Sequence, residues 1–305
     1  MSLSLASHGA PVDGDAAEPA ARRSRGVVPY LLLLPGIAWL VAFFAAPILA
    51  LFGTSLQTRV PGGEANQFQQ TFRFANYSDA VREYSNQLLR SFWYAGLATV
   101  LALAISYPVA YYIAHRAGRW RNILLVLVIA PFFASFVLRT IAWGQLLGEE
   151  GWIVHAVRWL HLLPDGSTLT ASPQAVVLGI TYNFLPFMTL PLYASLERID
   201  PRLIEAGADL YAGPLTTFRK VTVPLSMPGV VSGTLLTFIP AAGDYVNAAL
   251  LGRPRSTTMI GNVIQSRFFT LVDYPTAAVL SFILMATILV IVMVYIRRAG
   301  TEELV

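Results

Sequence analysis

Six long runs of apolar residues dominate the sequence, and they restrict the possible folds more than any other feature does. Four of the six contain no charged residue, and each of the other two contains one. A helix of about 20 apolar residues is long enough to cross the hydrocarbon core of a bilayer. We therefore expect an all-α integral membrane protein with six transmembrane helices, in which the internal prolines are tolerated. The runs cover residues 27–52, 91–114, 122–147, 172–196, 224–250 and 274–296.

The composition supports a membrane protein independently of these runs. Of the 305 residues, 55% are hydrophobic and 12% are charged, whereas an average soluble domain has about 25% charged residues. So few charges are insufficient to cover a water-exposed surface. The chain has no cysteine, which excludes disulfides and thiolate metal sites. The net charge of +4 is weak evidence for a nucleic-acid partner, because membrane proteins keep excess arginine and lysine on cytoplasmic loops.

The distribution of basic residues predicts the orientation of the chain. Six spans place both termini on one side of the membrane, together with the connections at residues 115–121 and 197–223. Twelve of the 21 basic residues lie in these connections and in the two tails. Because basic loops stay in the cytoplasm, we expect both termini and the connection at 197–223 to be cytoplasmic.

The two tails are expected to lie outside the membrane domain. Residues 1–26 are mostly small and polar, and such a composition buries too little apolar surface to fold. We predict a disordered cytoplasmic tail there. Residues 27–298 then form one six-span transmembrane domain, and residues 299–305 form a cytoplasmic C-terminal tail.

A polar segment, residues 199–230, separates two strongly apolar runs in the second half of the chain. Asp200-Pro201 is typical of a helix start, because aspartate accepts hydrogen bonds from free backbone N–H groups and proline suits the first helical position. The spacing predicts a helix over 202–210, a break at Gly213-Pro214 and a second helix that reaches the membrane near Pro224. An ordinary amphipathic loop explains these features equally well.

The same segment resembles the "EAA" loop of the membrane subunits of ABC importers, in which E-A-A is followed by a glycine and later by I-x-L-P. The spacing from Glu205 to Pro224 is kept, but Gly207 replaces the second alanine and Tyr211 stands at the usual glycine. Gly213 is then a candidate to supply the turn. The resemblance assigns the following residues to a loop that couples the chain to an ATPase: Glu205, Ala206, Gly207, Asp209, Leu210, Tyr211, Gly213 and Pro224.

Further stretches resemble this family, and two of them are closest to the permeases of spermidine/putrescine importers. The stretch at 29–56 is similar to the first span of the family, and 175–212 and 241–268 are similar to the polyamine permeases, except that Arg253 replaces an expected glycine. The resemblance implies a permease subunit of a type I ABC importer in the bacterial inner membrane. Its implied partners are a second homologous permease, two copies of a cytoplasmic ATPase and an extracytoplasmic solute-binding protein. The alternatives are the same architecture with another cargo, such as an amino acid, a sugar or another cation.

The chain lacks the motifs of an ATPase or a hydrolase. A P-loop requires Gly-Lys-Ser/Thr, whereas the only lysine, Lys220, lies between Arg219 and Val221. The four histidines are scattered, and no G-x-S-x-G motif is present. We therefore expect a transport subunit without a cofactor or metal of its own, with ATP and Mg²⁺ bound by the partner ATPase. An ABC-independent channel or a membrane-embedded enzyme is a distant alternative.

Two ionisable residues lie inside the apolar runs, and such residues are candidates for a functional site because burying a charge in a membrane is costly. We hypothesise that Asp244 faces the substrate pathway and attracts an ammonium group. Alternatively, Asp244 and Arg139 neutralise each other, or each lies at the outer interface. Asn183 either lines the pathway or joins helices. Aromatic residues that could add cation–π contacts, or serve only in packing, are Trp143, Tyr182, Phe184 and Tyr245.

Overall fold

A computed structural model describes residues 28–62, 67–159, 164 and 168–299 of the chain. The predicted N-terminal tail at 1–26 therefore lies outside the described residues, and of the predicted C-terminal tail at 299–305 only Ala299 is described, as the last residue of a helix. The chain divides into two units, residues 1–48 and 49–305. The first unit contains α1 (Val28–Leu40) and the π-helical turn η1 (Val41–Ala45), and the helix continues through α2 (Ala46–Ser55). By length and hydropathy, Leu32–Ser55 qualifies as a membrane span.

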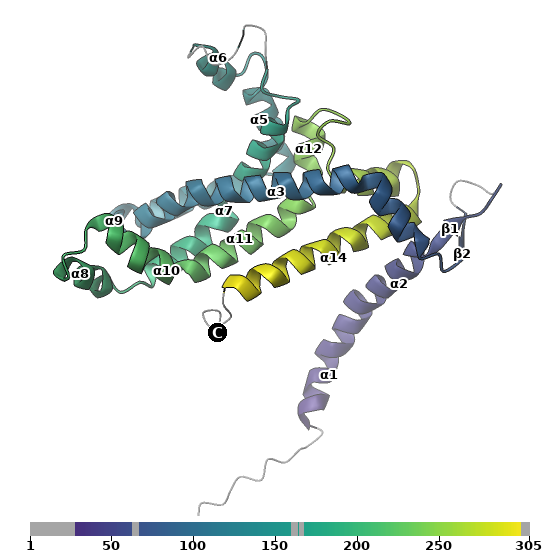
Figure 1. The fold of residues 1–305 in the computed structure, drawn as a ribbon, viewed down its shortest axis with the longest axis horizontal. Coiled ribbons are helices and arrows are strands. Elements are labelled where there is room, and N and C mark those ends of the chain that lie inside the picture. The colour runs from purple at the N-terminus through teal and green to yellow at the C-terminus, as the bar shows by residue number, and fades with distance from the viewer. Residues whose placement is uncertain (1–27, 63–66, 160–163, 165–167, 300–305) are drawn as a thin grey trace, which may run out of the picture. The chain divides into compact units, whose positions relative to one another are not determined.

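Four long helices form the body of the second unit and run side by side (Figure 1). They are α3 (Ala75–His115), α7 (Pro173–Glu197), α11 (Met227–Ala242) and α14 (Tyr274–Ala299). Helix α7 contacts both α3 and α11 along its length. With 41 residues, α3 is about 60 Å long, which exceeds the thickness of the hydrocarbon core. The bundle therefore has both a membrane-spanning part and an extension beyond it.

Small residues bring α11 close to α7. A methyl group built at Gly229 lies 2.6 Å from the Cβ atom of Ser195 and 2.7 Å from the carbonyl oxygen of Pro191. One turn later, a methyl group at Gly233 lies 2.8 Å from the sulfur of Met188. Glycines four residues apart let the backbones of two membrane helices approach closely. No larger residue fits at either position without moving one of the two helices.

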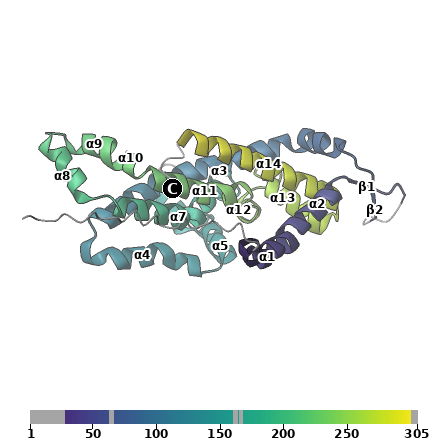
Figure 2. The same cartoon turned by 90° about the horizontal axis from the view of Figure 1, so that it is seen from below.

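The apolar run at 122–147 predicts a single span, but the structure bends it sharply. Helices η2 (Gly118–Trp120), α4 (Arg121–Ile129) and η3 (Ala130–Phe133) meet α5 (Phe136–Leu146) at 96°. The backbone at Ala134 and Ser135 is extended, with ψ values of 148° and 135°. Two adjacent extended residues interrupt the helical hydrogen bonds. Figure 2 shows α4 along one side of the bundle. Helix α5 turns away from the direction of α4.

The run at 224–250 is also broken, so one continuous helix is wrong for this segment too. The helical segment that precedes α11 ends at Leu225 and meets it at 61°. Helix α11 itself stops at Ala242, and after a short non-helical link α12 (Val246–Leu251) begins. Within the described residues, four helices are long and apolar enough to span a membrane, and six spans result if each bent pair counts as one.

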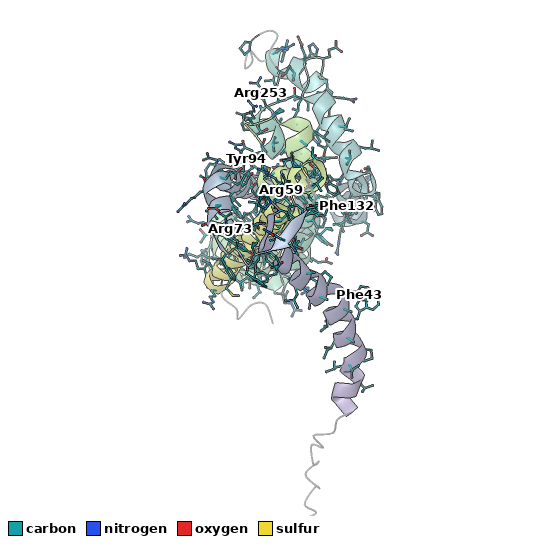
Figure 3. The ribbon with its side chains drawn as sticks, turned by 90° about the vertical axis from the view of Figure 1, so that its right-hand side faces the viewer. Phe43, Arg59, Arg73, Tyr94, Phe132 and Arg253 are labelled. Carbon is teal, nitrogen blue, oxygen red and sulfur yellow. The ribbon has the colours of Figure 1, made fainter. Side chains whose placement is uncertain are left out.

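Two groups of elements outside the bundle lie at its opposite ends. A hairpin of β1 (Gln57–Arg59) and β2 (Phe68–Gln70) lies at one end, and the helices of the polar segment lie at the other (Figures 1 and 2). Three short helical elements, α6 (Trp152–Trp159), α13 (Ile260–Gln265) and η5 (Ser266–Thr270), lie in the remaining connections. Among the side chains labelled in Figure 3, Tyr94 belongs to the buried core of α3 and α7, whereas Phe132 and Arg253 are exposed.

Candidate functional site

The polar segment folds into two short helical pieces joined by a tight turn. Helix α8 spans Pro201–Asp209, and the second piece runs continuously through α9 (Pro214–Thr217), η4 (Phe218–Thr222) and α10 (Val223–Leu225). We call residues 200–225 the loop module. The N–H of Arg202 donates a hydrogen bond of 2.9 Å to Oδ1 of Asp200, so the predicted helix start is confirmed. The predicted break before Pro214 is confirmed as well.

The turn of the loop module is made by Tyr211 rather than by Gly213. Tyr211 has a φ of +57°, in the left-handed region that favours glycine, whereas Gly213 has an ordinary φ of −63°. The alternative that Gly213 supplies the turn is therefore wrong. The N–H of Ala212 closes the turn by donating to the carbonyl oxygen of Gly207 at 3.0 Å. A left-handed backbone of the kind glycine favours thus occurs where the family pattern has glycine, although a large side chain occupies the position.

The other departure from the family pattern has a packing explanation. A methyl group at Gly207 lies 3.0 Å from Oγ1 and 3.1 Å from Cγ2 of Thr217, a residue that is buried in the facing helix. An alanine there requires Thr217 to move by a few tenths of an ångström. Glycine at 207 therefore allows α8 and α9 to pack closely at this point.

The loop module is anchored to the bundle through its second helical piece. The ring of Phe218 packs edge-on against Tyr107 and Tyr111 of α3, at 5.7 and 5.8 Å between centroids. The hydroxyl groups of Tyr107 and Ser226 form a hydrogen bond of 2.8 Å. These contacts connect the module to a helix of the bundle, so a displacement of the module is transmitted to α3. By contrast, most of the predicted coupling residues are exposed: Glu205, Ala206, Asp209, Leu210, Tyr211, Gly213 and Pro224.

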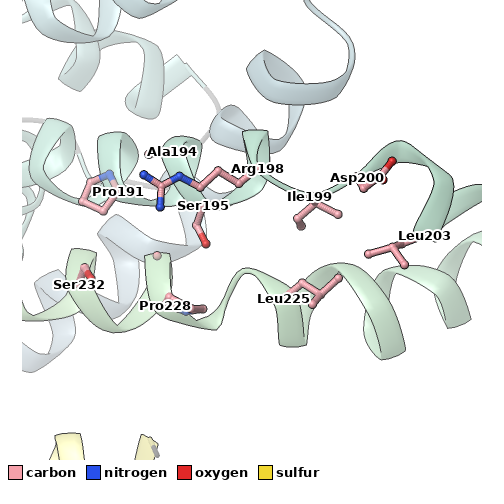
Figure 4. A pocket seen from close by; sticks show the side chains of 11 residues that line it. Pro191, Ala194, Ser195, Arg198, Ile199, Asp200, Leu203, Leu225, Pro228 and Ser232 are labelled. Carbon is pink, nitrogen blue, oxygen red and sulfur yellow. The ribbon is translucent and has the colours of Figure 1, made fainter. Parts of the chain in front are cut away.

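A pocket of about 530 Å³ opens between α7 and α11 next to the loop module. Figure 4 shows Ser195, Arg198 and Asp200 among its lining side chains. Leu203 of α8 and Leu225 of α10 also line the pocket. The pocket therefore joins the loop module to the end of the bundle.

A chain of buried polar side chains connects α5 and α12 with α7 of the bundle. The carboxylate of Asp244 accepts hydrogen bonds from the backbone N–H of Asn247, at 2.9 Å, and from its Nδ2, at 3.0 Å. The Oδ1 of Asn247 accepts from Nδ2 of Asn183, at 3.0 Å, and from the hydroxyl of Thr140, at 3.3 Å. All four residues are buried. We call Thr140, Asn183, Asp244 and Asn247 the polar network.

The polar network joins three helices and the link between α11 and α12. Thr140 lies on α5, Asn183 on α7 and Asn247 on α12, while Asp244 lies in the link that precedes α12. Asn183 is about 15 Å along α7 from Pro173 and about 21 Å from Glu197 at 1.5 Å per residue. Asn183 therefore lies near the middle of α7, far from both ends of this helix. We did not predict Thr140 or Asn247, although the three-residue spacing from Asp244 to Asn247 is typical of helix capping.

Arg139 and Asp244 do not pair. In the part of the chain that the structure describes, every ion pair involves other residues, so their mutual neutralisation is excluded within this chain. Arg139 is only 8% exposed, and its guanidinium lies over the rings of Phe132 and Phe136 at 5.6 and 5.7 Å. Its Nε and Nη1 have no hydrogen-bond acceptor among the described residues. A buried guanidinium without an acceptor is energetically costly.

The structure brings together some of the predicted aromatic residues and separates another. Trp143 of α5 and Tyr182 of α7 meet edge-on with 5.2 Å between centroids. Phe184 is buried and packs against Phe136 at 6.0 Å. Tyr245 is 46% exposed and has no ring contact among the described residues. Three of the four aromatic candidates therefore lie beside α5, near Arg139 and the polar network.

Comparisons with known proteins place the chain among transport proteins. Residues 106–299 match the model of the family "Binding-protein-dependent transport system inner membrane component". The chain is 34% identical over 264 residues to the spermidine/putrescine transport system permease protein PotB of Escherichia coli K12, covering 86% of this chain and 94% of that protein. The PotB protein of Haemophilus influenzae is 32% identical and is covered to 90%.

Solved structures show the same fold. A crystal structure of a bacterial ABC transporter that imports the acidic polysaccharide alginate matches with a TM-score of 0.66 and 19% identity, covering 89% of this chain and 94% of that chain. An inward-facing MetNI methionine ABC transporter matches with a TM-score of 0.54 and 17% identity, covering 70% and 94%. These relatives are transporter subunits whose fold matches the helical bundle described above. The chain belongs to the family of binding-protein-dependent transport system inner membrane components.

Proposed function

We propose that the chain is a permease subunit of a polyamine ABC importer and forms half of the translocation pathway for spermidine and putrescine. The observation that carries this proposal is the 34% identity to PotB, which extends over 94% of that protein. The alginate and methionine transporters share the fold at 17 to 19% identity, so they give no support to a sugar or an amino acid as cargo.

The proposed complex contains a second homologous permease, two copies of a cytoplasmic ATPase and an extracytoplasmic solute-binding protein. The need for an ATPase follows from the absence of a P-loop around the only lysine, Lys220. ATP and Mg²⁺ belong to the ATPase in this proposal. A solved relative of the same fold was captured with a pentasaccharide-bound periplasmic protein, which supports an external receptor.

The loop module is the proposed contact with the ATPase. It lies at the end of the bundle opposite the β1–β2 hairpin, which agrees with a cytoplasmic position of the module and an external position of the hairpin. Both termini are then cytoplasmic, with six spans. ATP binding draws the ATPases together, the modules of the two permeases follow, and the anchored helices alternate between outward-open and inward-open states. Binding at one site thus biases the state of another, which is allosteric coupling.

The polar network is the proposed polar part of the pathway. Its carboxylate, Asp244, is the only acidic group in the apolar runs, and an ammonium group of a polyamine is complementary to it. Tyr182 and Trp143 lie on the helices that the network joins, where a cation–π contact contributes about 0.5 to 2 kcal/mol. Arg139 precedes Thr140 of the network on α5 and is a further residue of the proposed pathway.

A reconstitution experiment tests the proposed function. The complex is purified from native membranes through this chain and placed in liposomes. ATP hydrolysis is then measured with receptor alone and with receptor plus spermidine, putrescine, an amino acid or a sugar. We expect an ATPase to co-purify and only the polyamines to stimulate it. Stimulation by another solute overturns the cargo, and failure to recover any ATPase overturns the importer.

The Glu205→Ala variant tests the role of the loop module in the same preparation. Glu205 is exposed on α8 and contributes one of the two carboxylates of that face. We expect weaker ATPase association and lower coupled hydrolysis, with unchanged binding of spermidine by the receptor. A normal complex with normal coupled hydrolysis contradicts the assignment of this carboxylate to the contact.

A further inference from the structure

Tyr211 combines backbone strain with complete exposure at the tip of the loop module. Its φ of +57° is unfavourable for a residue with a Cβ atom. Its side chain is 99% exposed, and no hydrogen bond or ring contact of this side chain occurs within the described residues. Strained residues persist where the strain serves a function, so an observed outlier points to a role.

The strain lies at the free end of the module, whereas the fixed end is well packed. Phe218, at the fixed end, is held by two tyrosines of α3. At the tip, Leu210 and Leu215 are 81% and 74% exposed, on either side of Tyr211 in the sequence. Three large side chains are therefore exposed near the tip, two of them on the turn and Leu215 on α9. A cluster of this kind, presented by a rigid turn, is suited to entering a pocket on another molecule.

We propose that Tyr211 anchors the loop module in an apolar pocket of the cytoplasmic ATPase subunit, flanked by Leu210 and Leu215, and that the rim of this pocket is basic. This inference rests on the proposed function. Tyrosine contributes a large contact area at a low cost in side-chain entropy and is frequent at the energetic centre of interfaces. The Tyr211 side chain is 99% exposed, so its ring is available to a partner.

The charge of the tip favours a protein partner over the membrane surface. Between Glu205 and Leu215 there are two carboxylates, Glu205 and Asp209, and no basic residue. The cytoplasmic leaflet is negatively charged and attracts basic segments, and helices that lie on membranes usually carry lysine or arginine on their polar face. An acidic rim around apolar side chains is instead complementary to a pocket lined by basic residues.

The proposal predicts opposite effects of one substitution on stability and on binding. Tyr211→Gly relieves the backbone strain, so the melting temperature of the permease stays equal or rises by about 1 to 3 °C. The same change removes the anchor, so the dissociation constant for the ATPase rises by about tenfold or more. A residue with a purely structural role changes both quantities in the unfavourable direction.

The test uses the complete permease pair in nanodiscs and the purified ATPase from the same transporter. Binding is measured by interferometry, and the melting temperature is measured on the permease pair alone. Tyr211→Gly and Tyr211→Asn both tolerate the left-handed backbone and lack the ring, so both are expected to bind weakly. Tyr211→Phe keeps the ring and is expected to bind within about threefold of the native chain. Leu289→Ala, an exposed apolar position on α14 outside the loop module, serves as the matched control and is expected to bind normally.

Two results overturn the anchor while leaving the proposed function intact. One is native-like ATPase binding by Tyr211→Gly, and the other is weaker binding together with a lower melting temperature. A loss of affinity that disappears when anionic lipid is omitted from the nanodiscs shows that the tip binds the membrane, and it also refutes the anchor. If the native permease pair binds no ATPase under any of these conditions, both the anchor and the proposed function fail.

Discussion

Gly229→Ala is expected to separate the two helices that carry the centre of the fold. The added methyl group lies 2.6 Å from Cβ of Ser195, 2.7 Å from the carbonyl oxygen of Pro191 and 3.1 Å from Cα of Leu192. Carbon atoms in contact are ordinarily about 3.5 to 4.0 Å apart. Because two of these three neighbours are backbone atoms of α7, rotation of a side chain does not relieve the overlap. Helix α11 must move by about 1 Å.

The magnitude follows from the cost of overpacking. Inserting one methylene-sized group into a packed interior typically costs about 1 to 3 kcal/mol. For domains of 150 to 250 residues each kcal/mol lowers the melting temperature by about 2 to 4 °C. We therefore expect Gly229→Ala to lower the melting temperature by roughly 2 to 12 °C. Uptake should fall further than the population of folded protein explains, since Ser195 and Gly229 both line the pocket between α7 and α11.

The assay is thermal unfolding of the permease in detergent, followed by tryptophan fluorescence, with uptake measured in parallel. Gly96→Ala is the matched control, because Gly96 lies within α3 and a methyl group there has no neighbour within 4 Å. That change should be neutral or stabilising by up to about 1 kcal/mol, owing to the better helix propensity of alanine. Equal melting temperatures for Gly229→Ala and Gly96→Ala would refute the close approach of α7 and α11.

Three further substitutions test individual groups. Asp244→Asn should lower spermidine uptake without affecting assembly, because one amide oxygen replaces two carboxylate oxygens that accept from Asn247; unchanged uptake makes a pathway role untenable. Arg139→Met should raise the melting temperature of the isolated chain, since replacing buried charges by apolar groups often stabilises by about 1 to 4 kcal/mol. The same substitution should change uptake. A melting temperature lower by several degrees would reveal an acceptor for this guanidinium. Asp200→Ala removes the hydrogen bond that caps α8, which is worth about 1 kcal/mol. Hydrogen exchange in α8 should therefore accelerate about fivefold. Asp200→Asn keeps the cap and should leave the exchange rate unchanged.

Several helices could be predicted from composition because their surroundings are uniform. A lipid-facing or core helix needs apolar residues along its whole length, and the runs at 172–196 and 274–296 agree closely with α7 and α14. Helix α3 begins well before its apolar run because residues 75–90 are amphipathic and continue the helix outside the membrane. Apolarity thus marks the part of a helix in the membrane, not the ends of the helix.

The loop module was predictable because its helix start and break depend on local chemistry. Asp200 caps α8 through a contact two residues away, and Pro214 begins the next helix. The turn was assigned to the wrong residue, since glycine is the usual occupant of a left-handed position. Only the folded chain shows Tyr211 in that conformation. The sequence contains no local feature that favours tyrosine there.

By itself, the sequence determined a helical membrane protein, the approximate spans, the loop module and the resemblance to importer permeases, because these depend on apolar runs and short spacings. Tertiary structure alone decided the bend at Ala134–Ser135, the end of α11 at Ala242, and the connection of Asp244 to Asn183 through Asn247. It also decided that Arg139 lies over aromatic rings instead of pairing with Asp244. These features depend on which faces of distant helices meet, and hydropathy along a single chain carries no information about that choice.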